Sequence, residues 1–297
     1  MKNIWSLLLV LSATTAFAQS GIEQLSDEFN DTASLQQWSL FHATEGYPSK
    51  IKSMGVSQGK LELQPKASGW YADNQGTFLF KTITGNFDVR TKVKVSGANS
   101  ALPTVDWSLA GLMVRQPKQT NKETWRPRQE NWLFITTGVA ERTDLPVFEV
   151  KSTNNSLSNL KLRPGKAGWV ELRIVRVQAA FILLARYEGE AWQILERFYR
   201  PVMMGPLQVG VNAYSSWNAV PQEVKSDPKV FNETVLDIPS DLLLQVDYIR
   251  FKRPVINEAQ LSRSYNAQYA GVLFYTPANL LTDFSVSNEE VLRIIGD

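Results

Sequence analysis

Apolar and polar residues alternate along most of the chain, which is the pattern of β-strands with one buried face. In residues 87–95, Phe and Val alternate with Asp, Arg and Lys. The same pattern predicts strands at 60–64, 87–95, 109–115, 131–137, 147–151, 169–176, 179–187, 192–198, 207–213 and 245–252. Turn signals such as Arg163-Pro164-Gly165 separate them. Many short strands with almost no helical periodicity predict an all-β sandwich or barrel.

Two polar stretches and the C-terminal region depart from this alternation. Residues 116–130 and 216–240 form long polar loops, which in a compact domain are either functional or solvated connections. Beyond Pro254, the sequence Ser287-Asn288-Glu289-Glu290 is a capping-box pattern and predicts a short C-terminal helix. The apolar segment 270–275 before it is expected to dock on a surface.

The first residues have the pattern of an export signal. Lys2 precedes the apolar run 4–11, and Ala16-Phe17-Ala18 is a small-x-small cleavage site. The run is too short to span a bilayer, and no other stretch is long and apolar enough to do so. We therefore predict a signal peptide at 1–18, a β-sandwich domain at 19–254, a C-terminal extension at 255–297, and a periplasmic or secreted protein.

Composition excludes several classes of function. The chain has no cysteine, which excludes disulfides, thiolate metal sites and a cysteine nucleophile. Its formal net charge is +2, and +1 once Lys2 is removed, without the basic clusters of a nucleic-acid binder. A single histidine, His42, argues against most zinc sites and Ser-His-Asp triads.

A series of fragments in order resembles the concanavalin A-like lectin/glucanase superfamily and, within it, the DUF1349 family. The fragments are 27–30 with Trp38, 78–81, 85–89, 110–115, 169–174 and 246–251, so that the resemblance covers about residues 22–253. It implies a jelly-roll sandwich of two antiparallel sheets, without cofactor. One sheet would be concave, with a groove that holds sugar in many members of the superfamily.

Carbohydrate recognition requires aromatic faces for the C–H surface of a sugar ring and planar polar groups for its hydroxyls. Trp70 and Tyr71 point to opposite sides if they lie in a strand, so one is core and the other is exposed or covers a loop. Asp73 follows within reach. Packing material beside a turn is the alternative interpretation of this aromatic pair.

A second group of candidates joins the 116–130 loop to the strands. Asn212 and Tyr214 share one face of their strand, which fits a solvated concave face. The loop is equally well explained as a solvated connection with one anchoring Trp. The predicted carbohydrate-binding residues are Trp70, Tyr71, Asp73, Arg115, Trp125, Glu130, Asn131, Trp132, Asn212 and Tyr214.

Catalysis remains an alternative. Hydrolases of this superfamily carry a Glu-x-Asp-x-x-Glu strand motif, which this sequence lacks. A glycoside hydrolase would have to take its two carboxylates from separate strands, for which Asp73 and Glu130 are the candidates. A polysaccharide lyase would need His42 beside a tyrosine such as Tyr47.

Asp27, Glu28 and Asp247 resemble a structural calcium position of some superfamily members, and their hard oxygen ligands suit that ion. The alternative interpretation is that these residues lie exposed in turns and bind no metal. The leading prediction is an exported domain that recognises an oligo- or polysaccharide in the concave groove. A glycoside hydrolase or lyase, and a protein-interaction domain whose C-terminal extension docks on a protein partner, are the alternatives.

Overall fold

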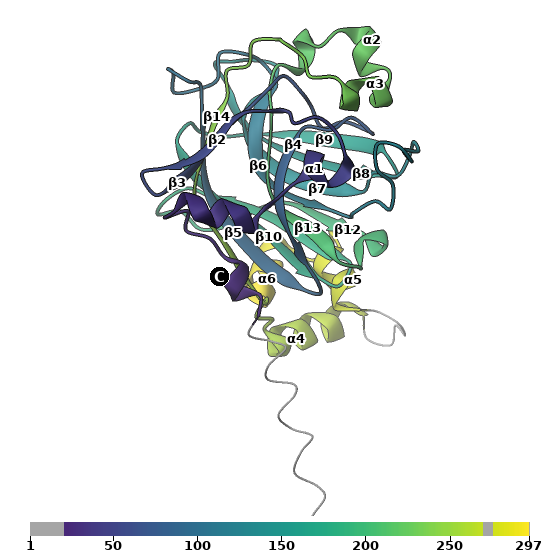
Figure 1. Cartoon of the computed structure of the whole chain (residues 1–297). Helices are drawn as coiled ribbons and strands as arrows, with labels where there is room; N and C mark the ends of the chain where they lie inside the picture. The colour runs from purple at the N-terminus through teal and green to yellow at the C-terminus, as the bar shows by residue number, and fades with distance from the viewer. Residues whose placement is uncertain (1–20, 270–275, 297) are drawn as a thin grey trace, which may run out of the picture.

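Two antiparallel β-sheets pack against each other (Figure 1) in the computed structural model, which describes residues 21–269 and 276–296. Within these residues, seven strands form sheet 1, in the order β1 (Ser39–Leu40), β4 (Thr77–Ile83), β13 (Leu207–Tyr214), β6 (Ser108–Arg115), β7 (Trp132–Val139), β8 (Pro146–Asn154) and β9 (Leu157–Pro164). Seven more form sheet 2, in the order β12 (Gln193–Tyr199), β11 (Ala180–Arg186), β10 (Trp169–Val177), β5 (Phe87–Ser96), β14 (Leu243–Lys252), β3 (Lys60–Pro65) and β2 (Ile51–Ser57). The predicted all-β sandwich is confirmed.

The main core lies between the two sheets, and alternation along each strand builds it. In β5, Val89 and Val93 face the core, whereas Arg90 and Lys92 point outward. Val93 pairs in register with Val170 of β10, so apolar residues of neighbouring strands meet on the same face. Each fully buried side chain of this kind stabilises the fold by about 1.5–3 kcal/mol.

The outer face of sheet 1 is buried as well. Every residue of β6, β7 and β13 is buried. Phe41 of α1 (Phe41–Glu45) and Trp70 of the loop between β3 and β4 pack onto the outward side chains of these strands. A second, aromatic cluster therefore covers this face. The prediction that Asn212 and Tyr214 lie on a solvated face is wrong, because both are at most 1% exposed.

The C-terminal region packs on the outer face of sheet 2. It consists of α4 (Glu258–Tyr269), α5 (Pro277–Thr282) and α6 (Asn288–Ile295), drawn in yellow-green and yellow in Figure 1. Side chains of α5 and α6 join a cluster with β10, β11 and Trp192. Ser287 accepts a hydrogen bond from the backbone of Glu290, so the predicted cap and helix are confirmed.

Two buried arginines attach this region to sheet 2. Arg197 of β12 donates to the carbonyl oxygens of Leu281, Asp283 and Val286. Arg173 of β10 donates to the carbonyl of Gly296 at 2.8 Å and also pairs with Asp88. α5 and α6 thus dock on the chain's own sandwich. The apolar segment 270–275, which the sequence predicts to dock, lies outside the described residues.

Helices elsewhere in the chain are short. α2 (Gln222–Lys225) and α3 (Pro228–Glu233) lie in the long loop after β13 and appear at the top of Figure 1. None of the helices in residues 21–269 and 276–296 has the length and apolar character needed to cross a membrane. The predicted signal peptide at 1–18 lies outside the described residues.

Candidate functional site

The loop between β3 and β4 lays Trp70 and Tyr71 across the outer face of sheet 1. Ser68 donates its backbone N–H to the carbonyl of Ser215 at 3.0 Å, which attaches the loop to the end of β13. Tyr71 and Asn74 exchange backbone hydrogen bonds around a tight turn. Trp70 is 1% exposed and Tyr71 is 48% exposed. One ring is therefore core and the other reaches solvent, as the sequence predicts.

The exposed side of this loop borders a pocket of about 160 Å³, which we call the aromatic pocket. Aromatic rings dominate its walls. It is lined by Gly69, Trp70, Tyr71, Trp107, Lys151, Leu160, Tyr214, Trp217 and Asn218. Five of these residues are aromatic, and they come from a loop, from β13 and from the segments flanking β6 and β13. Apolar rings with a few polar groups between them are the usual lining of a small-molecule site.

Trp217 is fixed in place by its neighbours. Its ring centroid lies 5.5 Å from that of Phe231 and 6.3 Å from that of Tyr71. The Nζ atom of Lys225 lies 5.2 Å from the Trp217 ring, within the range of a cation–π contact. Gly69 permits this position, because a Cβ atom on residue 69 would come within 2.2 Å of the indole. The wall formed by Tyr71 and Trp217 is thus set before any ligand binds.

Lys151 and Tyr214 belong to a buried network around Glu149, whereas Asn218 is exposed and donates to Asp106 at 2.6 Å. Nζ of Lys151 lies 2.8 Å from Oε1 of Glu149 and donates to the carbonyl of Trp70 at 2.9 Å. Thr136 and Tyr214 donate their hydroxyls to Oε2 of the same carboxylate. The charges of Lys151 and Glu149 balance, so the floor of the pocket is close to neutral.

Tyr214 remains a neutral phenol in this network. Burial, and next the negative charge of Glu149, raise the pKa of Tyr214 well above its ordinary value. Its O–H is committed to Glu149, while its ring faces the pocket. The pocket can therefore offer aromatic faces and an ammonium group in a fixed arrangement.

The lining of the aromatic pocket can be compared with the carboxylate pair of a glycosidase. A retaining glycosidase needs two carboxyl groups about 5–5.5 Å apart at the sugar, and an inverting one needs them farther apart. None of the residues that line the aromatic pocket in the described part of the chain carries a carboxylate. Glu149, which is not part of the lining, forms an ion pair with Lys151 and accepts a hydrogen bond from Tyr214.

Arg115 and Glu130 lie in a separate buried ion network. Arg115 contacts Glu130 at 2.8 Å and Glu45 at 2.7 Å, and Lys118 bridges the same two carboxylates. Burial alone would raise the pKa of Glu130, but the charges of Arg115 and Lys118 outweigh it and lower the pKa to about 2. Both residues are 0% exposed, so this network anchors the 116–130 loop, and the prediction that Arg115 and Glu130 contact a sugar is wrong.

The predicted catalytic carboxylates Asp73 and Glu130 are both buried and both bound by other groups of the chain. Asp73 is buried and accepts from the Ser156 hydroxyl at 2.6 Å and from the backbone N–H of Arg128. Glu130 is bound by Arg115 and Lys118. Each carboxylate has its own donors, and neither faces the aromatic pocket.

Four other predicted residues also lie away from the aromatic pocket. Trp132 is fully buried and stacks on Phe134 at 5.2 Å, so it is core and its predicted role in sugar contact is wrong. Asn131 exchanges hydrogen bonds with Asn155. Asn212 is buried, and Trp125 is half-buried in its loop outside the pocket lining. Of the ten predicted residues, Trp70, Tyr71 and Tyr214 meet at the pocket.

The predicted calcium ligands do not converge. Asp27 accepts from the Trp38 indole at 2.8 Å, Glu28 pairs with Arg250, and Asp247 lies 3.9 Å from Lys92. Across residues 21–269 and 276–296, no group of three or more His, Asp or Glu side chains is placed to hold a metal ion.

His42, the residue considered for a lyase, is buried away from the aromatic pocket. Burial, and next the charge of Lys50, lower the pKa of His42 to about 3, which keeps the imidazole neutral. Its Nδ1 accepts from the backbone N–H of Lys50 at 3.4 Å. Tyr47 is buried too, and its hydroxyl has no hydrogen-bond partner among the described residues.

Trp107, Lys151 and Trp217 are pocket residues that the sequence analysis did not identify. Trp107 precedes β6 and Trp217 follows β13, and these strands pair so that Tyr214 lies opposite Leu109. The segments just beyond this pairing therefore meet at one end of sheet 1. In the sequence, one Trp stands just before a predicted strand and another just after a second one. Their positions indicate a shared site only when the pairing of the two strands is known.

Comparison with known proteins supports the fold. No protein-family model and no curated protein matches the chain. A functionally unknown protein from Saccharomyces cerevisiae superposes with a TM-score of 0.52 at 14% identity, covering 74% of this chain and 98% of that one.

Two further structures are glycoside-hydrolase-family proteins. A mutant of a GH43 protein from Bacillus licheniformis matches with a TM-score of 0.52 at 12% identity, over 78% of this chain and 39% of that one. A xylan beta-1,4-xylosidase from Bacillus halodurans matches with a TM-score of 0.50 at 12% identity, over 77% of this chain and 39% of that one. At this level of identity the likeness shows the fold alone, a two-sheet jelly-roll sandwich.

Proposed function

We propose that this protein is an exported carbohydrate-recognition domain, and that it binds one sugar unit of an oligo- or polysaccharide in the aromatic pocket. The observation that carries the proposal is the ring of five aromatic residues around a near-neutral polar floor. Tyr71 and Trp217 supply faces for the C–H surface of a sugar. Asn218 and the ammonium group of Lys151 supply donors for its hydroxyls.

The size of the pocket favours a single ring. Pockets for drug-sized ligands occupy roughly 300–1,000 Å³, and the aromatic pocket occupies about 160 Å³. A longer glycan would place one unit against the wall formed by Tyr71 and Trp217 and continue over the surface beside Leu160, which is 38% exposed.

Export and family membership are part of this proposal. The pattern at 1–18 supports export to the periplasm or medium, where polysaccharides are met. Assignment to DUF1349 rests on the order of the sequence fragments and on the sandwich fold. Relatives of that family accompany glycoside hydrolases, which fits a module that holds a glycan while another protein acts on it.

The absence of a carboxylate from the pocket lining in the described residues supports binding over hydrolysis. The test is a glycan array on the purified protein, followed by calorimetric titration of each hit. We expect Tyr71→Ala and Trp217→Ala to weaken binding at least about tenfold, the range for an aromatic hot spot. Tyr199→Ala is the matched control, because Tyr199 is 44% exposed and lies on β12. Unchanged affinity in both pocket variants would contradict the proposal.

A further inference from the structure

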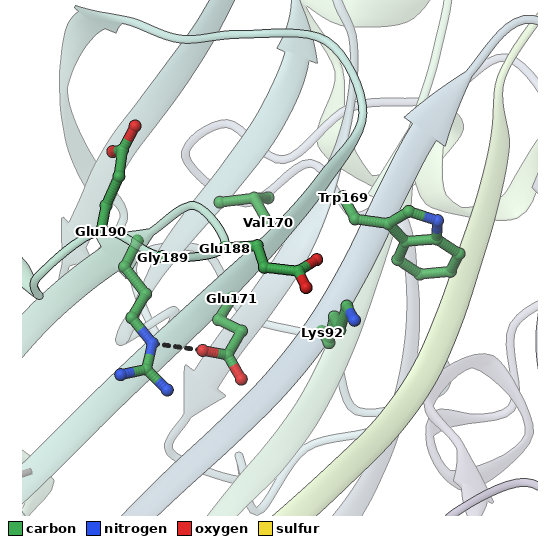
Figure 2. A pocket seen from close by; sticks show the side chains of 8 residues that line it. Lys92, Trp169, Val170, Glu171, Glu188, Gly189 and Glu190 are labelled. Carbon is green, nitrogen blue, oxygen red and sulfur yellow. Dashed lines mark hydrogen bonds and ion pairs between the residues drawn. The ribbon is translucent and has the colours of Figure 1, made fainter.

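A second pocket opens on the outer face of sheet 2, and Figure 2 shows it from close by. α5 and α6 cover one part of this face, over β10 to β12, and leave the part around Trp169 open. The pocket measures about 510 Å³ and is lined by Lys92, Trp169, Val170, Glu171, Arg186, Glu188, Gly189 and Glu190. We call it the outer pocket. Its volume lies within the usual range of about 300–1,000 Å³ for ligand sites.

Strand register places alternating charges across the floor of the outer pocket. Glu171 of β10 pairs with Lys92 of β5 on one side and with Arg186 of β11 on the other. Tyr248 of β14 continues the same row beyond Lys92. These side chains share the outward face because Val170 and Leu172, the neighbours of Glu171 in β10, point into the core. The result is a fixed row of donors and acceptors.

Contacts within the row hold it in one arrangement. Arg186 and Tyr248 both donate to the carboxylate of Glu171. The guanidinium of Arg186 also lies over Trp192, 4.3 Å from its ring, and Trp192 packs in the cluster beneath α5 and α6. Burial would raise the pKa of Glu171, but its bonds from Arg186 and Tyr248 lower it, so the carboxylate stays charged.

Trp169 and Glu188 form the walls above this floor. Trp169 is half-buried, and Figure 2 shows its indole at one side of the pocket with the Glu188 carboxylate directed toward it. Glu190, on the same turn, is bound to Lys166 at 2.6 Å. Within the pocket, Lys92 and Arg186 offset Glu171 and Glu188, and Lys92 also lies 3.9 Å from Asp247, so an indole face stands beside hydrogen-bonding groups of both charges.

This balance points to one class of ligand. A polyanion or a polycation would meet charges of its own sign, whereas a neutral polyhydroxylated ring can donate to the carboxylates and accept from Lys92. The indole of Trp169 supplies the apolar face that such a ring needs. We propose that the outer pocket is a second saccharide-binding site, independent of the aromatic pocket, for two or more units of a neutral glycan.

The two sites would lie on opposite outer faces of the sandwich, since one is built on sheet 1 and the other on sheet 2. One protein molecule could then hold two glycan chains, or wrap one flexible chain, and would gain avidity on an insoluble polysaccharide. The ligand class rests on the proposed function, but the site stands on its own residues.

The test follows indole N–H signals by NMR while xylotetraose, cellotetraose, laminaritetraose and mannotetraose are titrated into the purified protein. Trp169→Phe and Trp217→Phe assign the two signals. Saturable shifts of both signals, with a calorimetric stoichiometry of two that falls to one in Trp169→Ala, are the expected result. Glu188→Gln should weaken the Trp169 event at least fivefold and leave the Trp217 event unchanged.

Shifts at Trp217 alone would overturn the second site and leave the proposed function standing. Shifts at Trp169 alone would overturn the proposed function and leave the second site standing. The inference is overturned if the Trp169 signal does not shift with any of the four neutral sugars. It is also overturned if that signal shifts only with a cationic probe such as tetralysine. Tyr199→Ala serves as the control for both signals, and the melting temperature of each variant shows whether it is folded.

Discussion

The indole of Trp217 lies so close to Gly69 that a methyl group on residue 69 would come within 2.2 Å of it. We predict that Gly69→Ala displaces Trp217 and weakens glycan binding about tenfold or more. Overpacking of this kind costs about 1–3 kcal/mol of stability. Gly55→Ala is the matched control, because nothing lies within 4 Å of its new methyl group. Titration calorimetry and thermal melting separate the two effects, and a variant that binds normally would show that Trp217 is not a wall of the site.

Trp132 is predicted to act on stability. Its fully buried ring stacks on Phe134 and meets Trp70 edge-on at 5.8 Å, so removal leaves a large cavity. Trp132→Ala should lower the free energy of unfolding by about 3–5 kcal/mol. Trp125→Ala, which removes a half-buried loop side chain, should cost far less. Chemical denaturation measures both, and equal costs would contradict the assignment of Trp132 to the core.

The Arg115–Glu130 pair should make stability depend on acid pH. The pKa of Glu130 in the folded protein is lowered to about 2 from 4.5, so its contribution is complete above about pH 4.5. That contribution is lost as the pH falls through the folded value. Urea unfolding at pH 7, 4 and 3 should therefore show a smaller acid loss in Glu130→Gln than in the parent.

The same substitution should also cost stability at neutral pH, because it leaves Arg115 and Lys118 with less compensating charge. Removing one member of a buried ion pair costs about 3–5 kcal/mol. Glu23→Gln, at an exposed position, is the matched control. If Glu130→Gln follows the pH curve of the parent, the ion network does not set the acid limit.

Arg197 is predicted to hold the C-terminal region on sheet 2. Its guanidinium donates to three carbonyls of the segment 281–286, and lysine cannot reproduce this fork. Arg197→Lys should speed hydrogen exchange across α5 and α6 and leave exchange in β5 unchanged. Arg142→Lys, on an exposed loop, should change neither. Mass-spectrometric exchange resolves these segments, and uniform acceleration would indicate global destabilisation instead.

The sequence predicted β3, β5 to β8 and β10 to β14, including strands that are buried on both faces, and did not predict β1, β2, β4 and β9 from alternation. β5 alternates clearly because its outward residues are Arg and Lys. β4 entered only through the resemblance, because Phe78, Leu79 and Phe80 follow one another without alternation. β9 and β2 are edge strands with weak alternation, and every position in them is at least partly exposed.

The sequence contains a pattern which indicates that the outer face of sheet 1 is covered, but this pattern did not enter the prediction. β6 and β7 carry large apolar residues on both faces, including Met113, Trp132 and Phe134, which indicates burial on both sides. Adjacency alone predicted that one of Trp70 and Tyr71 is buried and the other exposed, but not which one. Trp107 and Trp217 could not be placed, because their meeting depends on the pairing of β6 with β13.

The docking of α5 and α6 sets a practical limit on how the protein can be shortened. A recombinant fragment that stops after Pro254 would retain the strands of both sheets. It would also expose Ile182, Leu184 and Trp192 as an apolar patch, and exposed apolar patches promote self-association. Expression trials of such a fragment should yield insoluble protein, and that insolubility would come from the missing cover while the strands themselves remain intact.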